Sequence, residues 1–173
     1  MFKKVLIYLS CVIILYACVC AFLPSYFFFE RKVAVARSKE VPFAAVASFR
    51  NWQYWSPWSD TSIRITFRGP ETHVGAEMQW ESNVDGGGGS NKIVDFTPYS
   101  YIKIETFTKR IGKPIYMEFK FEETAPKNCE VRWIQSGNLS FFERPFGLLM
   151  EKAMSKDIEQ GLLQLKAAAE ANN

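Results

Sequence analysis

An uncharged segment near the N-terminus constrains this chain more than any other feature of its sequence. The nineteen residues Val5–Leu23 contain no Asp, Glu, Lys or Arg, and two lysines, Lys3 and Lys4, precede them. As an α-helix rising about 1.5 Å per residue, such a run spans roughly the hydrocarbon core of a bilayer. We therefore expect residues 1–24 to be a transmembrane anchor and residues 25–173 a separate domain, so that residues 5–23 hold a single-pass protein in a membrane.

Two processed forms of the N-terminus are alternatives to an uncleaved anchor. A lysine pair before an apolar run also marks a secretory signal peptide, although nineteen residues is long for its apolar region and Leu23-Pro24-Ser25 is not a small-residue cleavage site. The second alternative is cleavage and lipid attachment at Cys18, which the preceding Ala17 favours and the bulky Tyr16 disfavours. An uncleaved anchor is the interpretation that fits the run best.

The charges that flank the apolar run leave the side of the membrane open. Basic residues on the cytoplasmic side usually set the orientation, and here they occur on both flanks. Two precede the run, and the following stretch contains Arg31, Lys32, Arg37 and Lys39. The count favours a cytoplasmic C-terminal domain, but long domains cross a membrane regardless of such charges.

The composition of the remaining chain excludes several classes of function. Of the 21 Lys and Arg residues two precede Val5, so 19 are left against 18 Asp and Glu, and this near-neutral balance argues against a nucleic-acid partner. Three of the four cysteines lie in the apolar run, which leaves Cys129 without a disulfide partner in the domain. His73 is the sole histidine, so the usual structural zinc sites are not expected, and no cofactor is indicated.

Alternation of apolar and polar residues predicts strands that bury one face each. We expect strands near 27–36 and 91–96, without assigned faces, and five more whose inward residues alternate with polar ones. The inward sets are Ile63, Ile65 and Phe67; Ala76, Met78 and Trp80; Ile102, Ile104 and Thr106; Ile115, Met117, Phe119 and Phe121; and Val131, Trp133 and Gln135. Gly69-Pro70 and other turn residues separate these runs, with residues 85–90 and their four glycines expected as a hairpin tip. Short spacings of this kind indicate an antiparallel sheet.

Two regions have helical rather than strand periodicity. Residues 38–58 carry apolar side chains at three-residue steps and predict one or two short helices that end at Pro57. The C-terminal segment predicts one long helix, because its apolar residues recur every three or four positions and would cover one face. That stripe comprises Met150, Met154, Ile158, Leu162, Leu165 and Ala169.

This order of elements, together with several motifs, resembles a known family. Phe49-Arg50-Asn51-Trp52-Gln53-Tyr54-Trp55-Ser56-Pro57-Trp58 is similar to its "F-x-N-W-x-x-W-S-P-W" signature, Gly69-Pro70 with Val74-Gly75-Ala76 and Trp80 to the next element, and Asp157-Ile158-Glu159-Gln160-Gly161-Leu162 to the closing helix. The family is the membrane-anchored branch of the polyketide cyclase/dehydrase-like proteins in the START-like (SRPBCC) superfamily. The resemblance implies an α+β helix-grip fold, with a curved seven-stranded antiparallel sheet, two short helices and a long C-terminal helix, and a bacterial inner-membrane location.

The resemblance also implies a cavity between the sheet and the long helix that holds a hydrophobic small molecule or lipid. We expect the cavity to be lined by inward-facing residues of the sheet, by tryptophans of the signature and by the start of the helix stripe. These are Trp55, Trp58, Met78, Trp80, Ile104, Thr106, Met117, Phe119, Trp133, Gln135, Met150, Met154 and Ile158. Gln135 and Thr106 would orient the polar part of a ligand. The tryptophans also suit a second role, as a packing corner between the short helices and the sheet.

Two other functions remain open at this point. One is a cyclase or dehydratase-type enzyme that uses a polar residue such as His73 or Gln135, although the sequence contains no catalytic motif of the family to carry across. The other is an interaction module at the membrane, in which the same apolar side chains fill the core completely. The three functions differ in whether an unfilled space remains between sheet and helix.

Overall fold

The computed structural model describes residues 2–58, 63–81 and 87–171. Its elements follow the predicted order of helix, strand, two short helices, six strands and long helix. They are α1 (Phe2–Phe22), β1 (Tyr26–Val35), α2 (Glu40–Ala47), the 3-10 helix η1 (Phe49–Tyr54), β2 (Arg64–Arg68), β3 (Glu77–Glu81), β4 (Gly88–Thr97), β5 (Tyr101–Thr108), β6 (Pro114–Ala125), β7 (Asn128–Asn138), the 3-10 helix η2 (Phe141–Glu143) and α3 (Arg144–Ala171). The predicted helix-grip fold is confirmed.

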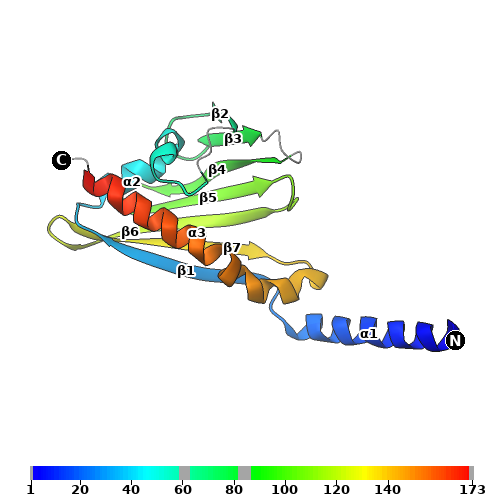
Figure 1. Cartoon of the computed structure of the whole chain (residues 1–173). Coiled ribbons are helices and arrows are strands. Elements are labelled where there is room, and N and C mark those ends of the chain that lie inside the picture. Colours follow the sequence, from blue (N-terminus) through cyan, green and yellow to red (C-terminus); the bar gives the residue numbers. More distant parts are fainter. Residues whose placement is uncertain (1, 59–62, 82–86, 172–173) are drawn as a thin grey trace.

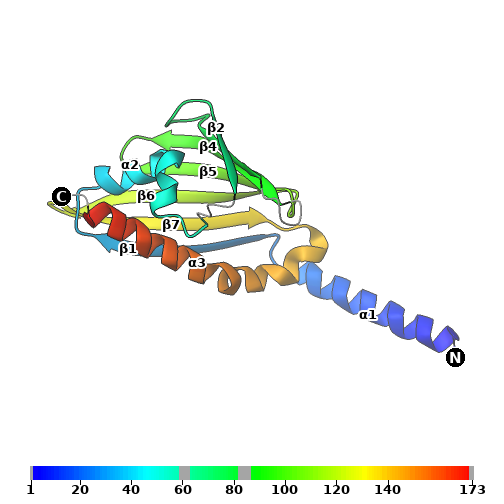
Figure 2. The same ribbon diagram turned by 45° about the horizontal axis from the view of Figure 1, so that its top comes forward.

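All strand pairs are antiparallel and form one seven-stranded sheet. The strands from β2 to β7 follow one another as a meander, and β1 adds to the far edge beside β7, which gives the order β1-β7-β6-β5-β4-β3-β2. Figures 1 and 2 show this sheet curving beneath the helices. The meander follows from the short turns between the strands, because two neighbouring antiparallel strands need no crossover connection.

The long helix α3 lies on the concave face of the sheet, over β1 and β7 (Figure 2). The predicted apolar stripe of α3 faces the sheet, and Ile158, Leu162 and Leu165 in it are fully or almost fully buried. Gly161 permits the close approach, because a Cβ there would lie 2.9 Å from the Trp133 ring. Arg31 of β1 forms ion pairs with Glu151 and Glu159 of the helix.

The two short helices, α2 and η1, are joined by indole groups of the tryptophan signature. The last carbonyl groups of a helix lack partners within it. Here Trp52 donates its indole N–H to the carbonyl of Val46, and Trp55 donates to that of Ala45, both at 3.0 Å. Trp52 and Trp55 are also almost fully buried. These contacts match the packing corner that the sequence allowed.

Part of the hairpin tip predicted at residues 85–90 belongs to a strand instead. Residues 85 and 86 lie outside the described part of the chain, but Gly88, Gly89 and Ser90 belong to β4. A Cβ on Gly89 would meet the Trp80 ring at 2.5 Å and the carbonyl oxygen of Phe107 at 2.2 Å. Glycine therefore serves here as a strand residue that leaves space for an indole ring.

The apolar N-terminal helix α1 projects from the domain at the end where β1 and α3 begin (Figure 1). Its length and composition suit a membrane span, and only Cys20 among its described side chains is buried. Hydrogen bonds join it to the domain. The Tyr16 hydroxyl donates to the carbonyl of Phe142 at 2.7 Å, and Arg144 donates to the carbonyl of Cys20 at 3.0 Å.

Candidate functional site

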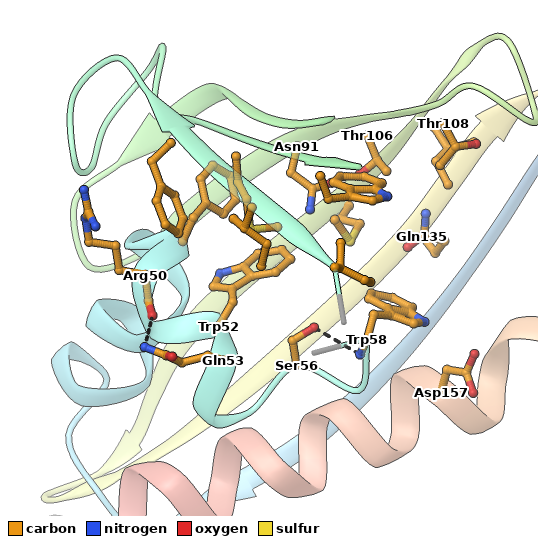
Figure 3. Close-up of a pocket in the computed structure, with 18 of the residues that line it drawn as sticks. Arg50, Trp52, Gln53, Ser56, Trp58, Asn91, Thr106, Thr108, Gln135 and Asp157 are labelled. Carbon is orange, nitrogen blue, oxygen red and sulfur yellow. Dashed lines mark hydrogen bonds between the residues drawn. The ribbon is translucent and has the colours of Figure 1, made fainter. Parts of the chain in front are cut away.

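A cavity of about 880 Å³ lies between the concave face of the sheet, η1 and the first half of α3 (Figure 3). Pockets for small molecules usually measure about 300–1,000 Å³. Most of the residues around it are apolar, and they come from β2 to β7 as well as from the helices. The lining residues are Phe49, Arg50, Trp52, Gln53, Ser56, Trp58, Ile63, Ile65, Phe67, Met78, Trp80, Asn91, Thr106, Thr108, Ile111, Ile115, Met117, Gln135, Met154 and Asp157. The space can hold a ligand larger than a single aromatic ring.

The apolar wall of the cavity is uncovered at the β2 edge of the sheet. Ile65 and Phe67 point inwards from β2, yet their side chains are 42% and 37% exposed. Met117 on the floor is 2% exposed, whereas Met154 on α3 is only half-buried. Methionine side chains adapt their shape easily, so these two residues provide a deformable floor and roof.

One polar side chain at the floor of the cavity has no hydrogen-bond partner. Gln135 of β7 is 1% exposed, and neither its amide nitrogen nor its amide oxygen is bonded to a described residue. In Figure 3 its side chain lies between Thr106 and Trp58. Burying an amide without a hydrogen bond costs about 1–3 kcal/mol. Gln135 therefore offers a bound molecule up to two N–H donors and a carbonyl oxygen that can accept.

The neighbouring polar groups of the cavity are already paired with each other. The Thr106 hydroxyl donates to the side-chain oxygen of Asn91 at 2.7 Å, and both residues are buried. This bond leaves the amide nitrogen of Asn91 as a further donor near the cavity (Figure 3). Thr106 thus supports Asn91 in addition to lining the wall.

Two charged residues lie at the rim of the cavity. Arg50 follows the start of η1, and its guanidinium lies 4.6 Å from the centre of the Phe67 ring. Asp157 lies on α3, across the cavity from the η1 side (Figure 3). The floor is uncharged by comparison. A molecule with an apolar body and a neutral polar group fits this distribution better than a buried ion does, because desolvating a charge is costly.

A pair of titratable groups with shifted pKa values lies on the opposite, outer face of the sheet. The Tyr101 hydroxyl donates to Glu118 at 2.9 Å, and burial together with this bond raises the pKa of Tyr101. Burial alone would raise the pKa of Glu118, but bonds from Lys103 and Tyr101 outweigh it and lower that pKa. This network stabilises the sheet and is remote from the cavity.

Seven of the thirteen residues that the sequence proposed for the site line the cavity. They are Trp58, Met78, Trp80, Thr106, Met117, Gln135 and Met154. Of the others, Trp55, Ile104, Phe119, Trp133 and Ile158 are fully or almost fully buried, and Met150 is half-buried against the same core. The Trp55 ring meets Phe119 and Trp133 edge-on, with ring centres 6.1 Å away in both cases. These six residues therefore lie in the core or pack against it.

Several cavity residues were not proposed as site residues from the sequence. The inward faces of the strands already pointed to Ile63, Ile65, Phe67 and Ile115, so periodicity could have found them. The alternation gave no faces for the strand that carries Asn91, and nothing singled out Thr108. Arg50, Gln53 and Ser56 belong to the tryptophan signature, from which only tryptophans were predicted to line the site.

His73, the residue considered for catalysis, lies away from the cavity. It occupies a turn with φ of 80°, its Nδ1 is 2.7 Å from the Thr72 hydroxyl oxygen, and its ring lies 4.4 Å from that of Phe96. Over residues 2–58, 63–81 and 87–171, no group of three or more His, Cys, Asp or Glu is placed to hold a metal ion. The cavity itself contains apolar, amide and hydroxyl groups, with charges only at its rim.

Comparisons with known proteins find one family and several solved structures. The family described as polyketide cyclase / dehydrase and lipid transport matches residues 27–170. Zhui aromatase/cyclase from Streptomyces sp. R1128 is 14% identical, with a TM-score of 0.62 over 84% of this chain and 94% of that one. Norcoclaurine synthase from Thalictrum flavum, in complex with dopamine and hydroxybenzaldehyde, is 7% identical, with a TM-score of 0.64 over 86% and 88%.

A further structural neighbour is not described as a biosynthetic enzyme. The Aha1 dimer from Colwellia psychrerythraea is 19% identical, with a TM-score of 0.58 over 83% of this chain and 96% of that one. No curated protein matches the sequence. At these identities the structural neighbours establish a shared fold, and the fold alone does not determine what occupies the cavity.

Proposed function

This chain belongs to the polyketide cyclase/dehydrase and lipid transport family, and from that premise we propose that it binds a hydrophobic small molecule or lipid in the cavity while α1 anchors it in a membrane. The observation that carries the proposal is the combination of an apolar space of about 880 Å³ with a buried, unpaired amide, Gln135, at its floor. A completely filled core would have left neither. The cavity therefore favours binding over the filled-core interaction module.

The driving force for binding would be the removal of apolar surface from water. Each Å² of apolar surface buried contributes about 25 cal/mol, and the exposed inner face of β2 would be covered together with the ligand. Gln135 and the Asn91 amide would then supply hydrogen bonds that fix the ligand's orientation. Thirteen residues were proposed for this role from the sequence, and we now assign it to the seven that line the cavity.

An enzymatic reaction receives less support from the arrangement of the residues. General acid–base catalysis needs a titratable group within hydrogen-bond reach of the substrate. His73 lies away from the cavity, and Asp157 is an exposed residue at the rim. We therefore propose a binding protein rather than a cyclase, in which α1 raises the local concentration of membrane-derived ligands.

The proposal is tested with the full-length chain held in lipid nanodiscs. Small molecules that copurify are identified by mass spectrometry, and a fluorescent sixteen-carbon fatty acid is then titrated while its own emission is recorded. The test variant is Thr108→Trp, which places an indole in the cavity. Its matched control is Thr66→Trp, which places the same group on the exposed outer face of β2.

We expect Thr108→Trp to weaken binding of the probe by at least about tenfold, or 1.4 kcal/mol, because the indole occupies the volume that the acyl chain needs. Thr66→Trp should bind as the unchanged protein does. Equal affinities for the two variants would place the probe outside the cavity. Absence of both probe uptake and a copurified molecule would contradict the proposed function.

A further inference from the structure

An exposed apolar surface lies beside the C-terminal end of α1, although its residues come more than a hundred positions later in the sequence. It is formed by η2 and the first two turns of α3. Phe142 is 61% exposed, Phe146 57% and Leu149 59%, with Leu148 beside them at 64%. Single exposed apolar residues are common, but a contiguous group of large ones usually marks an interaction site.

The two charges within this segment are engaged by other parts of the protein. Glu143 accepts a hydrogen bond from the backbone N–H of Ser140 at 2.7 Å and forms an ion pair with Lys113. Arg144 donates to the backbone carbonyl of Cys20 at 3.0 Å, and its guanidinium lies 5.1 Å from the centre of the Phe141 ring. The outward-facing side chains of residues 141–149 are consequently apolar, and the next carboxylate on α3 is that of Glu151, which pairs with Arg31.

A contact with α1 sets the depth of this surface relative to the helix. Tyr16 donates its hydroxyl hydrogen to the carbonyl of Phe142, and the two rings stack in parallel with centres 6.3 Å apart. Tyr16 precedes the last residue of α1, Phe22, by six positions, or about 9 Å along the helix axis. If α1 spans a bilayer, Phe142 must therefore lie below the level at which α1 leaves it. Apolar faces of interfacial helices are buried about 5–10 Å, which is the same range.

Basic residues lie beside the apolar surface. The turn between β5 and β6 carries exposed Lys109 and Arg110, and Lys113 of the same turn is the ion-pair partner of Glu143 in η2. Figures 1 and 2 show the β5–β6 turn and the start of α3 at the end of the domain that faces α1. Apolar residues next to lysine and arginine are the pattern of surfaces that bind anionic membranes.

We infer that this end of the domain docks on the bilayer, with Phe142, Phe146 and Leu149 inserted at the boundary of headgroups and acyl chains and with Lys109 and Arg110 at anionic headgroups. We call these five residues the docking surface. The inference rests on the proposed anchoring by α1, and it adds a second, fixed contact that orients the domain. A tether alone would let the domain rotate.

The docking surface also adjoins the cavity. Ile111 lies in the same turn as Lys109 and Arg110, is 46% exposed, and lines the cavity. Docking therefore brings the Ile111 rim to the membrane surface. A hydrophobic ligand can then pass between bilayer and cavity over a short apolar route, without first dissolving in water.

The inference is tested by electron paramagnetic resonance on the full-length chain in liposomes that contain phosphatidylglycerol. Cys11 and Cys18 are replaced by alanine, while Cys20 and Cys129, which are 0% exposed, are kept. A spin label is attached in turn at Phe146→Cys in the docking surface, Ile13→Cys in α1 and Leu163→Cys. Leu163 is the matched control. Like Phe146 it is an exposed residue of α3, at 61%, and it lies about 25 Å further along that helix.

Collisions with oxygen, which dissolves in lipid, are compared with collisions with a nickel chelate, which stays in water. We expect the label at 146 to resemble that at 13, with an oxygen-to-nickel ratio several-fold above that at 163. A label at 13 in lipid and a label at 146 as accessible to nickel as 163 would overturn the docking surface and leave the anchor standing. A label at 13 in water would overturn the anchor and, with it, the docking surface.

The contribution of the headgroups is tested separately. Lys109→Gln with Arg110→Gln should raise nickel accessibility at 146 several-fold in anionic liposomes, because basic residues near such a surface are attracted to its negative charge. In liposomes of phosphatidylcholine alone, the protein without these two substitutions should show the same rise in nickel accessibility at 146. An unchanged depth at 146 in both arms would remove Lys109 and Arg110 from the docking surface.

Discussion

Replacement of Gln135 by leucine is expected to stabilise the empty protein and to weaken ligand binding at the same time. Most substitutions of buried residues lower stability, so a rise would be informative. The expectation follows from the burial of Gln135, which is 1% exposed and whose two amide atoms have no hydrogen-bond partner among the described residues. Leucine has nearly the same size and no polar atoms that need a partner.

The size of each effect follows from the lost and gained interactions. Removing an unsatisfied buried amide should recover about 1–3 kcal/mol of folding free energy. In a chain of this length each kcal/mol raises the midpoint of thermal unfolding by about 2–4 °C. Binding moves in the opposite direction, because one hydrogen bond to the ligand, worth about 0.5–1.5 kcal/mol, is lost. The dissociation constant should therefore rise roughly 2–10-fold.

Both quantities are measured on the same nanodisc preparation. Tryptophan emission during heating, after bound molecules have been removed, reports the unfolding midpoint, and titration with the fluorescent fatty acid reports affinity. Gln160→Leu is the control, since Gln160 is exposed on α3 and is already hydrated. A lower midpoint for Gln135→Leu would show that the amide is satisfied in the empty protein. Unchanged affinity would show that the probe does not use it.

Two further substitutions test the fold that supports the cavity. Gly161→Ala should lower the free energy of unfolding by about 1 kcal/mol. Crowding of Trp133 and Pro57 by the added methyl group costs about 1–3 kcal/mol, and the better helix propensity of alanine returns only about 1 kcal/mol. An unchanged thermal midpoint would show that the two rings can move aside. Glu118→Gln should cost about 0.5–1.5 kcal/mol at pH 7, measured by thermal unfolding. Since the folded protein lowers the pKa of Glu118, its stabilisation is present above the unfolded value near 4.3 and is lost as the pH falls through the folded value, so the difference should vanish in acid. A difference that stays constant as the pH is lowered would contradict this electrostatic origin.

Much of the fold could be predicted from the sequence because its elements have clear periodicity. The alternation from Ile115 to Glu122 predicted β6 and its buried face correctly, and the stripe from Met150 to Ala169 predicted the side of α3 that packs, although the helix begins earlier, at Arg144. The pattern was less useful near Gly88 and Gly89, because a glycine run resembles a turn. The reason for glycine at position 89 is the indole of Trp80 on the neighbouring strand, a contact between residues that alternation does not reveal.

The lining of the cavity could be predicted only in part. Periodicity shows which face of a strand a side chain occupies, but not what lies above it. Ile104 and Thr106 share a face of β5, for example, yet Ile104 is core and Thr106 lines the cavity. The unpaired state of Gln135 was likewise invisible, because it depends on the absence of partners on the neighbouring elements.

The position of the cavity follows from the widths of the two layers. Seven strands spaced about 4.8 Å apart form a sheet close to 30 Å across, whereas one helix with its side chains is about 10 Å wide. Because α3 lies over β1 and β7, the short helices are what covers the strands towards β2 among the residues that the structure describes. The exposed inner side chains of Ile65 and Phe67 are the consequence. A single long helix cannot close such a sheet, so either larger side chains must fill the remaining space or another molecule must, and here the lining leaves about 880 Å³ open for one.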